Sequence, residues 1–177
     1  DAMTTPRDFR GKVVAVTGAA GGLGRALVHA FAQVGAQVAA LDRDAAALAV
    51  LAQETAGTPL MTAVCDVTRL DDCQAAIAHV CERLGGVDLL INNAGIAHRS
   101  AFPDTQVDVL RRVMDVNFFG AAHCTHAALP SLRQRRGMVV AISSVAGFSP
   151  LIGRTGYAAS KHALHGFFDS LRTEVQD

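Results

Sequence analysis

Short apolar runs alternate with longer stretches of helical periodicity along the chain, and this alternation restricts the possible folds more than any other feature. A continuous apolar run is typical of a buried strand, and apolar residues three or four positions apart are typical of a helix. The predicted strands cover residues 12–17, 37–41, 59–65, 87–92 and 137–143. The predicted helices cover residues 23–34, 45–56, 70–84, 105–135 and 156–177, with a break expected in the fourth near Asn117. Strands that alternate with helices pair in parallel through right-handed crossovers, so we expect an α/β fold, a doubly wound parallel sheet with helices on both faces.

The composition indicates a globular chain without a polyanionic partner. The sequence has 177 residues, which suits one domain spanning residues 1–177. Lys and Arg total 16, as do Asp and Glu, so the formal net charge of zero gives no reason to expect nucleic acid or a membrane as partner. No apolar run reaches the roughly 18 residues of a membrane span. Met3 resembles a natural start and no signal-peptide pattern surrounds it, so we expect a cytoplasmic protein.

Three glycines follow the first predicted strand, where the first helix begins. Gly18, Gly22 and Gly24 have a G-x-x-x-G-x-G spacing rather than G-x-G-x-x-G. Glycine permits tight backbone geometry and close approach of a ligand, and a helix start offers unpaired N–H groups to an anion. A packing role alone would explain the glycines; binding of a pyrophosphate is the alternative.

An acidic residue at the end of the second predicted strand favours the pyrophosphate. Asp42 follows Gly24 by 18 residues, near the roughly 20 expected of the carboxylate that binds the ribose hydroxyls of a dinucleotide. We therefore expect a Rossmann-type sheet with three α/β/α layers. A carboxylate at this place repels a 2′-phosphate, so NAD is the expected cofactor and NADP the less favoured one. Arg43 beside it either softens this rejection or faces solvent, and we favour solvent.

Neither the cysteines nor the histidines predict a metal site. The four cysteines are Cys65, Cys73, Cys81 and Cys124. None forms a C-x-x-C pair, and free cysteines are commonly buried, so we expect buried or half-buried thiols. His123 and His126 lie three residues apart in a predicted helix, but no third ligand accompanies them.

Four motifs together resemble those of the short-chain dehydrogenase/reductase family. They are Thr17-Gly18-x-x-x-Gly22-Leu23-Gly24, Asn92-Asn93-Ala94-Gly95, Ser144, and Tyr157-Ala158-Ala159-Ser160-Lys161. They occur in the family's order and at its spacing, over almost the whole chain. Y-x-x-x-K alone often arises by chance, whereas the four motifs in combination are specific.

The resemblance implies an oxidoreductase that transfers a hydride between a nicotinamide cofactor and a secondary alcohol or ketone. Tyr157 would be the general acid/base, and Lys161 its electrostatic partner and a contact to the nicotinamide ribose. The two lie four residues apart on one helix face, and an ammonium near a phenol favours the phenolate. Ser144, 13 residues before Tyr157, would donate to the substrate oxygen, with Ser143 as the less favoured choice.

The resemblance assigns further residues to the site. Asn117 matches an asparagine that helps to hold a water linking the lysine to solvent, although a polar side chain satisfying a helix kink would also explain it. Asp66, with Val67, would contact adenine. The cofactor residues implied are Gly18, Gly22, Leu23, Gly24, Asp42, Arg43, Asp66, Val67, Asn93, Ala94, Gly95, Tyr157 and Lys161. A structural role alone would also explain residues 93–95.

The resemblance also implies a homodimer or homotetramer acting on a small alcohol or carbonyl compound. Family members usually continue with a sixth strand, a substrate-covering loop and helix, and a seventh strand, none of which is present here. The sequence thus predicts a domain truncated after the Y-x-x-x-K helix, with the fifth strand as an exposed sheet edge. We expect the remaining elements to lie outside this sequence. A non-catalytic dinucleotide-binding module and an inactive fragment stay open as alternatives to an enzyme.

Overall fold

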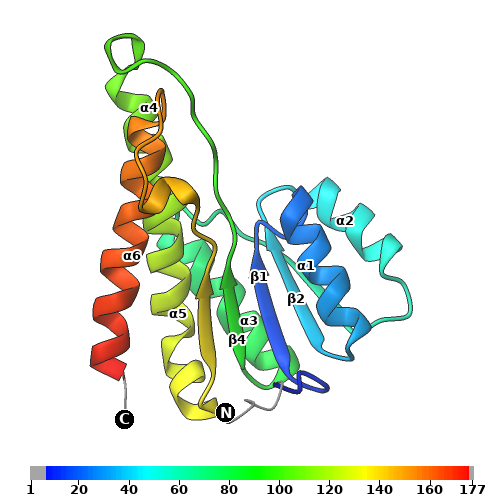
Figure 1. Cartoon of the computed structure of the whole chain (residues 1–177). Coiled ribbons are helices and arrows are strands. Elements are labelled where there is room, and N and C mark those ends of the chain that lie inside the picture. The colour runs from blue at the N-terminus through cyan, green and yellow to red at the C-terminus, as the bar shows by residue number, and fades with distance from the viewer. Residues whose placement is uncertain (1–6, 176–177) are drawn as a thin grey trace, which may run out of the picture.

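A parallel sheet of five strands forms the middle of the structure, a computed structural model that describes residues 7–175 (Figure 1). The strands are β1 Val13–Thr17, β2 Gln37–Asp42, β3 Leu60–Val64, β4 Leu89–Asn92 and β5 Met138–Ala141. Their order is β3-β2-β1-β4-β5, and every neighbouring pair is parallel. The predicted doubly wound α/β sheet is confirmed. Met3 and the last two residues lie outside the described residues.

Helices cover both faces of this sheet and complete the three layers. The helices are α1 Gly22–Gln33, α2 Ala45–Glu54, α3 Leu70–Leu84, α4 Val107–Met114, α5 Gly120–Arg135 and α6 Thr155–Val175. Shorter helical turns are η1 Phe102–Asp104, η2 Asp115–Phe119 and η3 Val145–Gly147. α1 and α2 lie on one side of the sheet and α3 and α5 on the other, with α6 at the β5 end (Figure 1). No helix within residues 7–175 is long and apolar enough to cross a membrane.

The central strands bury both of their faces, which explains their continuous apolar sequence. Side chains alternate between the two faces of a strand. Val13 and Ala15 therefore pack in one cluster with Val80 of α3, whereas Val14 packs in a second cluster with Val28 of α1. Burial on both sides by helices is the usual setting of a parallel sheet.

The break expected near Asn117 takes the form of a π-helical turn. α4 passes into α5 through η2, so the helical path continues instead of stopping. Asn117 lies in the middle of this turn and is buried. Such single π-turns frequently occur at functional sites.

The strand order places a topological switch between β1 and β4. The chain moves from β1 outward to β2 and β3, then returns to β4 on the other side of β1. Ligands of doubly wound sheets bind beyond the carboxyl ends of the strands at such a switch. β5 is the edge strand on that side, as predicted, and a hollow of about 950 Å³ lies beside it between α5 and α6.

We expect Leu90→Ala to lower the free energy of unfolding by about 2–5 kcal/mol, because it empties a fully buried site in β4. Urea unfolding followed by circular dichroism measures the change. Leu70→Ala is the matched control, since Leu70 is 38% exposed at the start of α3 and its truncation leaves no internal cavity. Equal losses in the two variants would contradict the buried position of β4.

Candidate active site

The carboxyl ends of β1, β2 and β4 open onto a pocket of about 430 Å³. This volume lies in the usual range of small-molecule and cofactor pockets. All of the residues that the sequence analysis assigned to the cofactor line this pocket. Two predicted catalytic residues, Asn117 and Ser144, are not among the lining residues. The structure thus brings the predicted cofactor residues together, while their individual roles remain predictions.

The three glycines after β1 differ in how closely other atoms surround the place where a side chain would begin. Gly18 has φ +61°, and a Cβ there would lie 2.8 Å from the Cα of Ala94. A Cβ on Gly24 would lie 2.8 Å from the Cα of Ala19. At Gly22, by contrast, a Cβ would meet no atom within 4 Å. The fold itself therefore requires Gly18 and Gly24, whereas the open space at Gly22 suits the approach of a ligand.

The first turn of α1 is arranged to receive an anion. Its N-cap residue, Gly21, provides no side-chain hydrogen bond, and the first turn carries no acidic residue. The N–H groups at the start of a helix have no partner within the helix, and they carry a partial positive charge. This donor set and the space at Gly22 fit a pyrophosphate.

Thr17 and Asn93 join residues 18–24, which we call the glycine turn, to the end of β4. The Asn93 side-chain amide donates to the carbonyl oxygens of Thr17 (2.9 Å) and Gly18 (3.1 Å). The Thr17 hydroxyl oxygen accepts from the backbone N–H groups of Asn93 and Ala94, both at 3.0 Å. The Asn93 side chain thus shapes the turn, which is the structural role that the sequence left open. The sequence analysis named Thr17 only as part of a motif and gave it no role, whereas its hydroxyl accepts two of the hydrogen bonds that join the turn to β4.

Asp42 and Arg43 lie at the end of β2, on the pocket wall. One carboxylate oxygen of Asp42 accepts from the N–H of Ala20 at 3.0 Å, and the other accepts from the N–H of Asp44 at 3.0 Å. These bonds hold the carboxylate beside the glycine turn, where it can accept from ribose hydroxyls. Arg43 is exposed.

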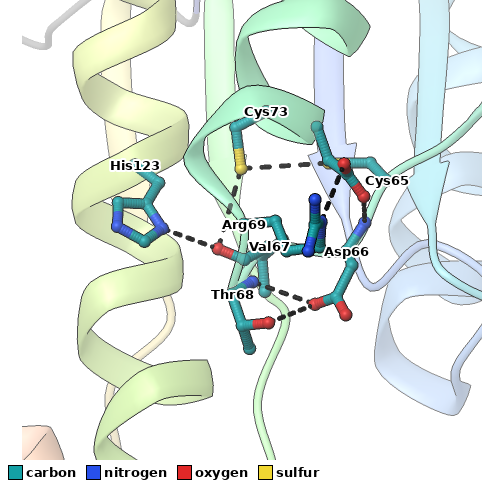
Figure 2. A network of polar contacts seen from close by, with 8 residues as sticks. Cys65, Asp66, Val67, Thr68, Arg69, Cys73 and His123 are labelled. Carbon is teal, nitrogen blue, oxygen red and sulfur yellow. Dashed lines mark hydrogen bonds and ion pairs between the residues drawn. The ribbon is translucent and has the colours of Figure 1, made fainter.

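Asp66 and Val67 follow β3 and also line the pocket. Asp66 accepts from the hydroxyl (2.8 Å) and the backbone N–H (3.0 Å) of Thr68, and these hydrogen bonds lower the pKa of its carboxyl group (Figure 2). The carbonyl oxygen of Val67 lies 2.9 Å from Nδ1 of His123 (Figure 2). A carbonyl oxygen only accepts, so Nδ1 carries the proton.

Tyr157 and Lys161 lie on one face of α6 at the pocket. The Lys161 Nζ is 5.7 Å from the centre of the Tyr157 ring and donates to the carbonyl oxygen of Ile142 at 2.8 Å. Lys161 is only 5% exposed, and this burial lowers the pKa of its ammonium group. The arrangement places a buried cation beside a phenol, because residues four apart share a helix face.

Asn117 locks the π-turn onto the segment after β4. Its side-chain oxygen accepts from the N–H of Ile96 at 2.8 Å, and its amide donates to the carbonyl oxygen of Ile96 at 3.0 Å. The amide also donates to the Ser160 hydroxyl at 3.0 Å. A Cβ on Gly95 would lie 3.4 Å from the Asn117 oxygen and 3.8 Å from the Lys161 Nζ. Asn117 thus satisfies the polar groups around the turn, and its predicted link to a water remains a prediction.

Ser143 and Ser144 have different partners. The Ser143 Oγ is 2.6 Å from Nε2 of His165, and Ser143 lines the pocket. The Ser144 Oγ accepts from the N–H of Ala146 at 3.2 Å, as the N-cap of η3. An N-cap oxygen acts as an acceptor, which leaves the Ser144 hydroxyl hydrogen available to another oxygen. The preference for Ser144 over Ser143 stays a prediction from the motif spacing.

Sequence reasoning missed several pocket residues that belong to no motif. Ile96 and Ala97 follow β4, and Ile142 follows β5. Their position just past the carboxyl ends of parallel strands is the signal that indicates a place at the site. Ile142 also supplies the carbonyl oxygen that accepts from Lys161.

Comparison with known proteins identifies relatives of this fold and site. The family model described as short chain dehydrogenase matches residues 12–177. Dehydrogenase/reductase SDR family member 7B of Bos taurus is 43% identical over 176 residues, which cover 94% of this chain and 54% of the relative. The 11-beta-hydroxysteroid dehydrogenase-like 2 protein of Arabidopsis thaliana is 36% identical over 169 residues, which cover 93% of this chain and 55% of the relative. The chain therefore spans about half the length of the curated relatives it matches.

Solved structures share the same fold. A short chain dehydrogenase/reductase from Burkholderia phymatum in complex with NAD matches with a TM-score of 0.92 at 30% identity, covering 96% of this chain and 62% of that chain. The apo form of LigO from Sphingobium sp. strain SYK-6 matches with a TM-score of 0.91 at 25% identity, covering 96% of this chain and 64% of that chain. The family model covers every strand of the sheet and both the glycine turn and the Tyr157–Lys161 pair, and the chain therefore belongs to the short-chain dehydrogenase family.

Proposed function

We propose that this chain carries the cofactor-binding and catalytic core of an NAD(H)-dependent oxidoreductase that interconverts a secondary alcohol and a ketone. The observation that carries the proposal is the buried Lys161 ammonium beside Tyr157, on the wall of the pocket that the glycine turn also lines. Burying a charged ammonium group costs free energy of folding. Its placement beside a phenol is therefore better explained by chemistry than by stability.

The proton step belongs to Tyr157. In the reducing direction its hydroxyl gives a proton to the carbonyl oxygen of the substrate, and in the oxidising direction the phenolate takes one from the alcohol. Lys161 stabilises the phenolate electrostatically, because its ammonium lies 5.7 Å from the ring centre. Ser144 donates its hydroxyl hydrogen to the same substrate oxygen as negative charge develops there.

The residues around the pocket would hold the cofactor along its length. The helix start at Gly22 would bind the pyrophosphate, Asp42 the adenosine ribose, and Asp66 with Val67 the adenine. Bound there, NAD(H) supplies or accepts the hydride. The Asp42 carboxylate favours a free 2′-hydroxyl over a 2′-phosphate, and the Burkholderia phymatum relative in complex with NAD supports this choice.

The substrate class rests on both chemistry and a relative's name. A tyrosine that exchanges a proton with an oxygen atom suits an alcohol and its carbonyl partner. The name of the Arabidopsis thaliana relative refers to a hydroxysteroid, a compound with an alcohol group. We also retain a homodimer or homotetramer and a cytoplasmic location as predictions, which size-exclusion chromatography with light scattering and cell fractionation would test.

We expect Tyr157→Phe to lower kcat by about 10²–10⁴-fold while leaving NADH affinity nearly unchanged, because only the hydroxyl is removed. Turnover on a panel of alcohols and ketones, measured with the whole protein, and a parallel NADH fluorescence titration separate the two effects. Tyr157 is the only tyrosine among residues 1–177, so no other phenol in this sequence can take over its role. Unchanged turnover would contradict the proposed role of Tyr157 as the general acid/base. NADH binding by a protein that turns over no compound of the panel would favour the non-catalytic module instead.

Wild-type protein should bind NADH more tightly than NADPH. Asp42→Ala should lower the ratio of the two affinities by about tenfold or more, because NADH loses a charge-assisted hydrogen bond and the 2′-phosphate of NADPH is no longer repelled. Parallel fluorescence titrations with the two cofactors measure the ratio. Asp44→Ala is the control, because this neighbouring acid caps α2 and is not among the pocket-lining residues. Tighter binding of NADPH by the wild type would overturn the choice of NAD.

The Lys161 ammonium should titrate below the ordinary value of 10.5 in the folded protein, because burial disfavours its charged form. Between the folded pKa and 10.5 the unfolded chain binds more protons, so this group makes the folded state more stable as the pH rises through that window. NMR of the 177-residue chain with ¹³C-labelled lysine resolves the titration readily, since Lys12 is the only other lysine in this sequence. Lys161→Met assigns the signal, and a midpoint at or above 10.5 would contradict the buried setting.

A further inference from the structure

Three of the four cysteines meet in the interior beside the nucleotide pocket. Cys65 directly follows β3, Cys73 lies in the first turn of α3, and Cys124 lies in α5. All three are buried, which confirms the expectation of buried thiols, whereas Cys81 is half-buried. A polar contact joins the sulfur atom of Cys73 to that of Cys65, as the dashed line between the two residues in Figure 2 marks. Nothing in the spacing of these residues along the chain indicates that they lie together.

The sulfur atoms have the separations that a bound metal ion needs. The Sγ atoms of Cys73 and Cys65 are 4.0 Å apart, and those of Cys73 and Cys124 are 3.5 Å apart. All three lie within 4.8 Å of one another. Thiolates that bind one ion at about 2.3 Å are themselves about 3.8–4.0 Å apart in tetrahedral or trigonal geometry. The two separations that involve Cys73 lie within about 0.5 Å of these values, and the third is at most 4.8 Å, so the thiols must draw together only slightly to hold one ion.

The surroundings define which kind of ion fits. Among the described residues, the group of potential ligands that lie together consists of these three sulfur atoms. The neighbouring His123 donates its Nδ1 hydrogen to the carbonyl oxygen of Val67. That carbonyl oxygen lies 3.7 Å from the Sγ of Cys73, so it belongs to the shell around the thiols (Figure 2). Ile77 and Val80 belong to the same apolar core cluster as the thiols, and the carboxylates of Asp66 and Asp72 lie on the solvent side of it. Ligands that are sulfur atoms alone select soft ions over hard ones.

We propose that Cys65, Cys73 and Cys124 bind one soft, thiophilic metal ion, with Cu⁺ and Zn²⁺ as the ions of this class to test. The proposal goes beyond the redox function and does not depend on it. It differs from the sequence analysis, which led us to expect no metal site.

The protonation of the cluster is compatible with this role. Hydrogen bonding with the thiols of Cys124 and Cys73 lowers the pKa of Cys65 well below the usual range of a cysteine. Hydrogen bonding with Cys65 and Cys73, together with burial, raises the pKa of Cys124. Cysteine binds a metal ion as the thiolate, so binding of the ion to these thiols releases protons. The affinity should accordingly fall as the pH falls.

Cys65 lies between the cluster and the pocket. It is the one member of the cluster that lines the nucleotide pocket. Its backbone N–H donates to the carbonyl oxygen of Asp42 at 2.9 Å. The cluster therefore lies directly behind the residues proposed to hold adenosine.

The test uses reduced, chelator-treated protein titrated separately with Zn²⁺ and Cu⁺ against a competing chromophoric chelator. We expect one ion per chain for at least one of the two, and X-ray absorption of the loaded wild type should show three sulfur ligands, at about 2.3 Å for zinc. This measurement needs no variant, so it stands even if a substituted protein fails to fold.

Variants locate the site. Cys73→Ala should weaken binding by about 100-fold or more, because Cys73 contacts both other sulfur atoms. Cys81→Ala is the matched control, a cysteine of the same helix outside the cluster, and should bind like the wild type. Circular dichroism establishes that both variants are folded. The proposal fails if neither ion binds, if the bound ion has nitrogen or oxygen ligands only, or if folded Cys73→Ala binds as tightly as Cys81→Ala.

Discussion

The hydrogen bonds between the ends of β1 and β4 hold together the two halves of the sheet at the point where the strand order reverses. The Asn93 amide reaches the carbonyl oxygens of Thr17 and Gly18, and the Thr17 hydroxyl receives two N–H groups in return. Gly18 fits there only because it lacks a Cβ. These hydrogen bonds set the position of the glycine turn. This turn then directs the first N–H groups of α1 toward the pocket.

A second set of hydrogen bonds places α6, the helix that carries Tyr157 and Lys161, against the sheet. Asn117 binds both polar backbone groups of Ile96 and also the Ser160 hydroxyl, so the π-turn, the segment after β4 and α6 meet at one side chain. Lys161 is then buried against the carbonyl oxygen of Ile142. Because a buried ammonium is costly unless it is hydrogen-bonded, the bond to Ile142 helps the cation to lie beside Tyr157.

Much of the fold and site could be predicted because the signals are local. A strand run is apolar because both faces are covered, and Asp44 caps α2 through a hydrogen bond to Ala47 within its own turn. The pairing of Tyr157 with Lys161 follows from the pitch of a helix. The pocket that gathers the motif residues follows from the rule that parallel strands end at the same edge.

Other features depend on distances between segments that are remote in the sequence. The partner of Asn117 is Ile96, the partner of Ser143 is His165, and Cys124 meets Cys73 across 51 positions. Local periodicity carries no information about these distances, because the packing of α5 and α6 against the sheet sets them. The sequence by itself thus determined the doubly wound sheet, the glycine turn and the Tyr157–Lys161 pair. Only the tertiary structure decided what holds them in place and which thiols lie together, since both depend on how separate layers pack.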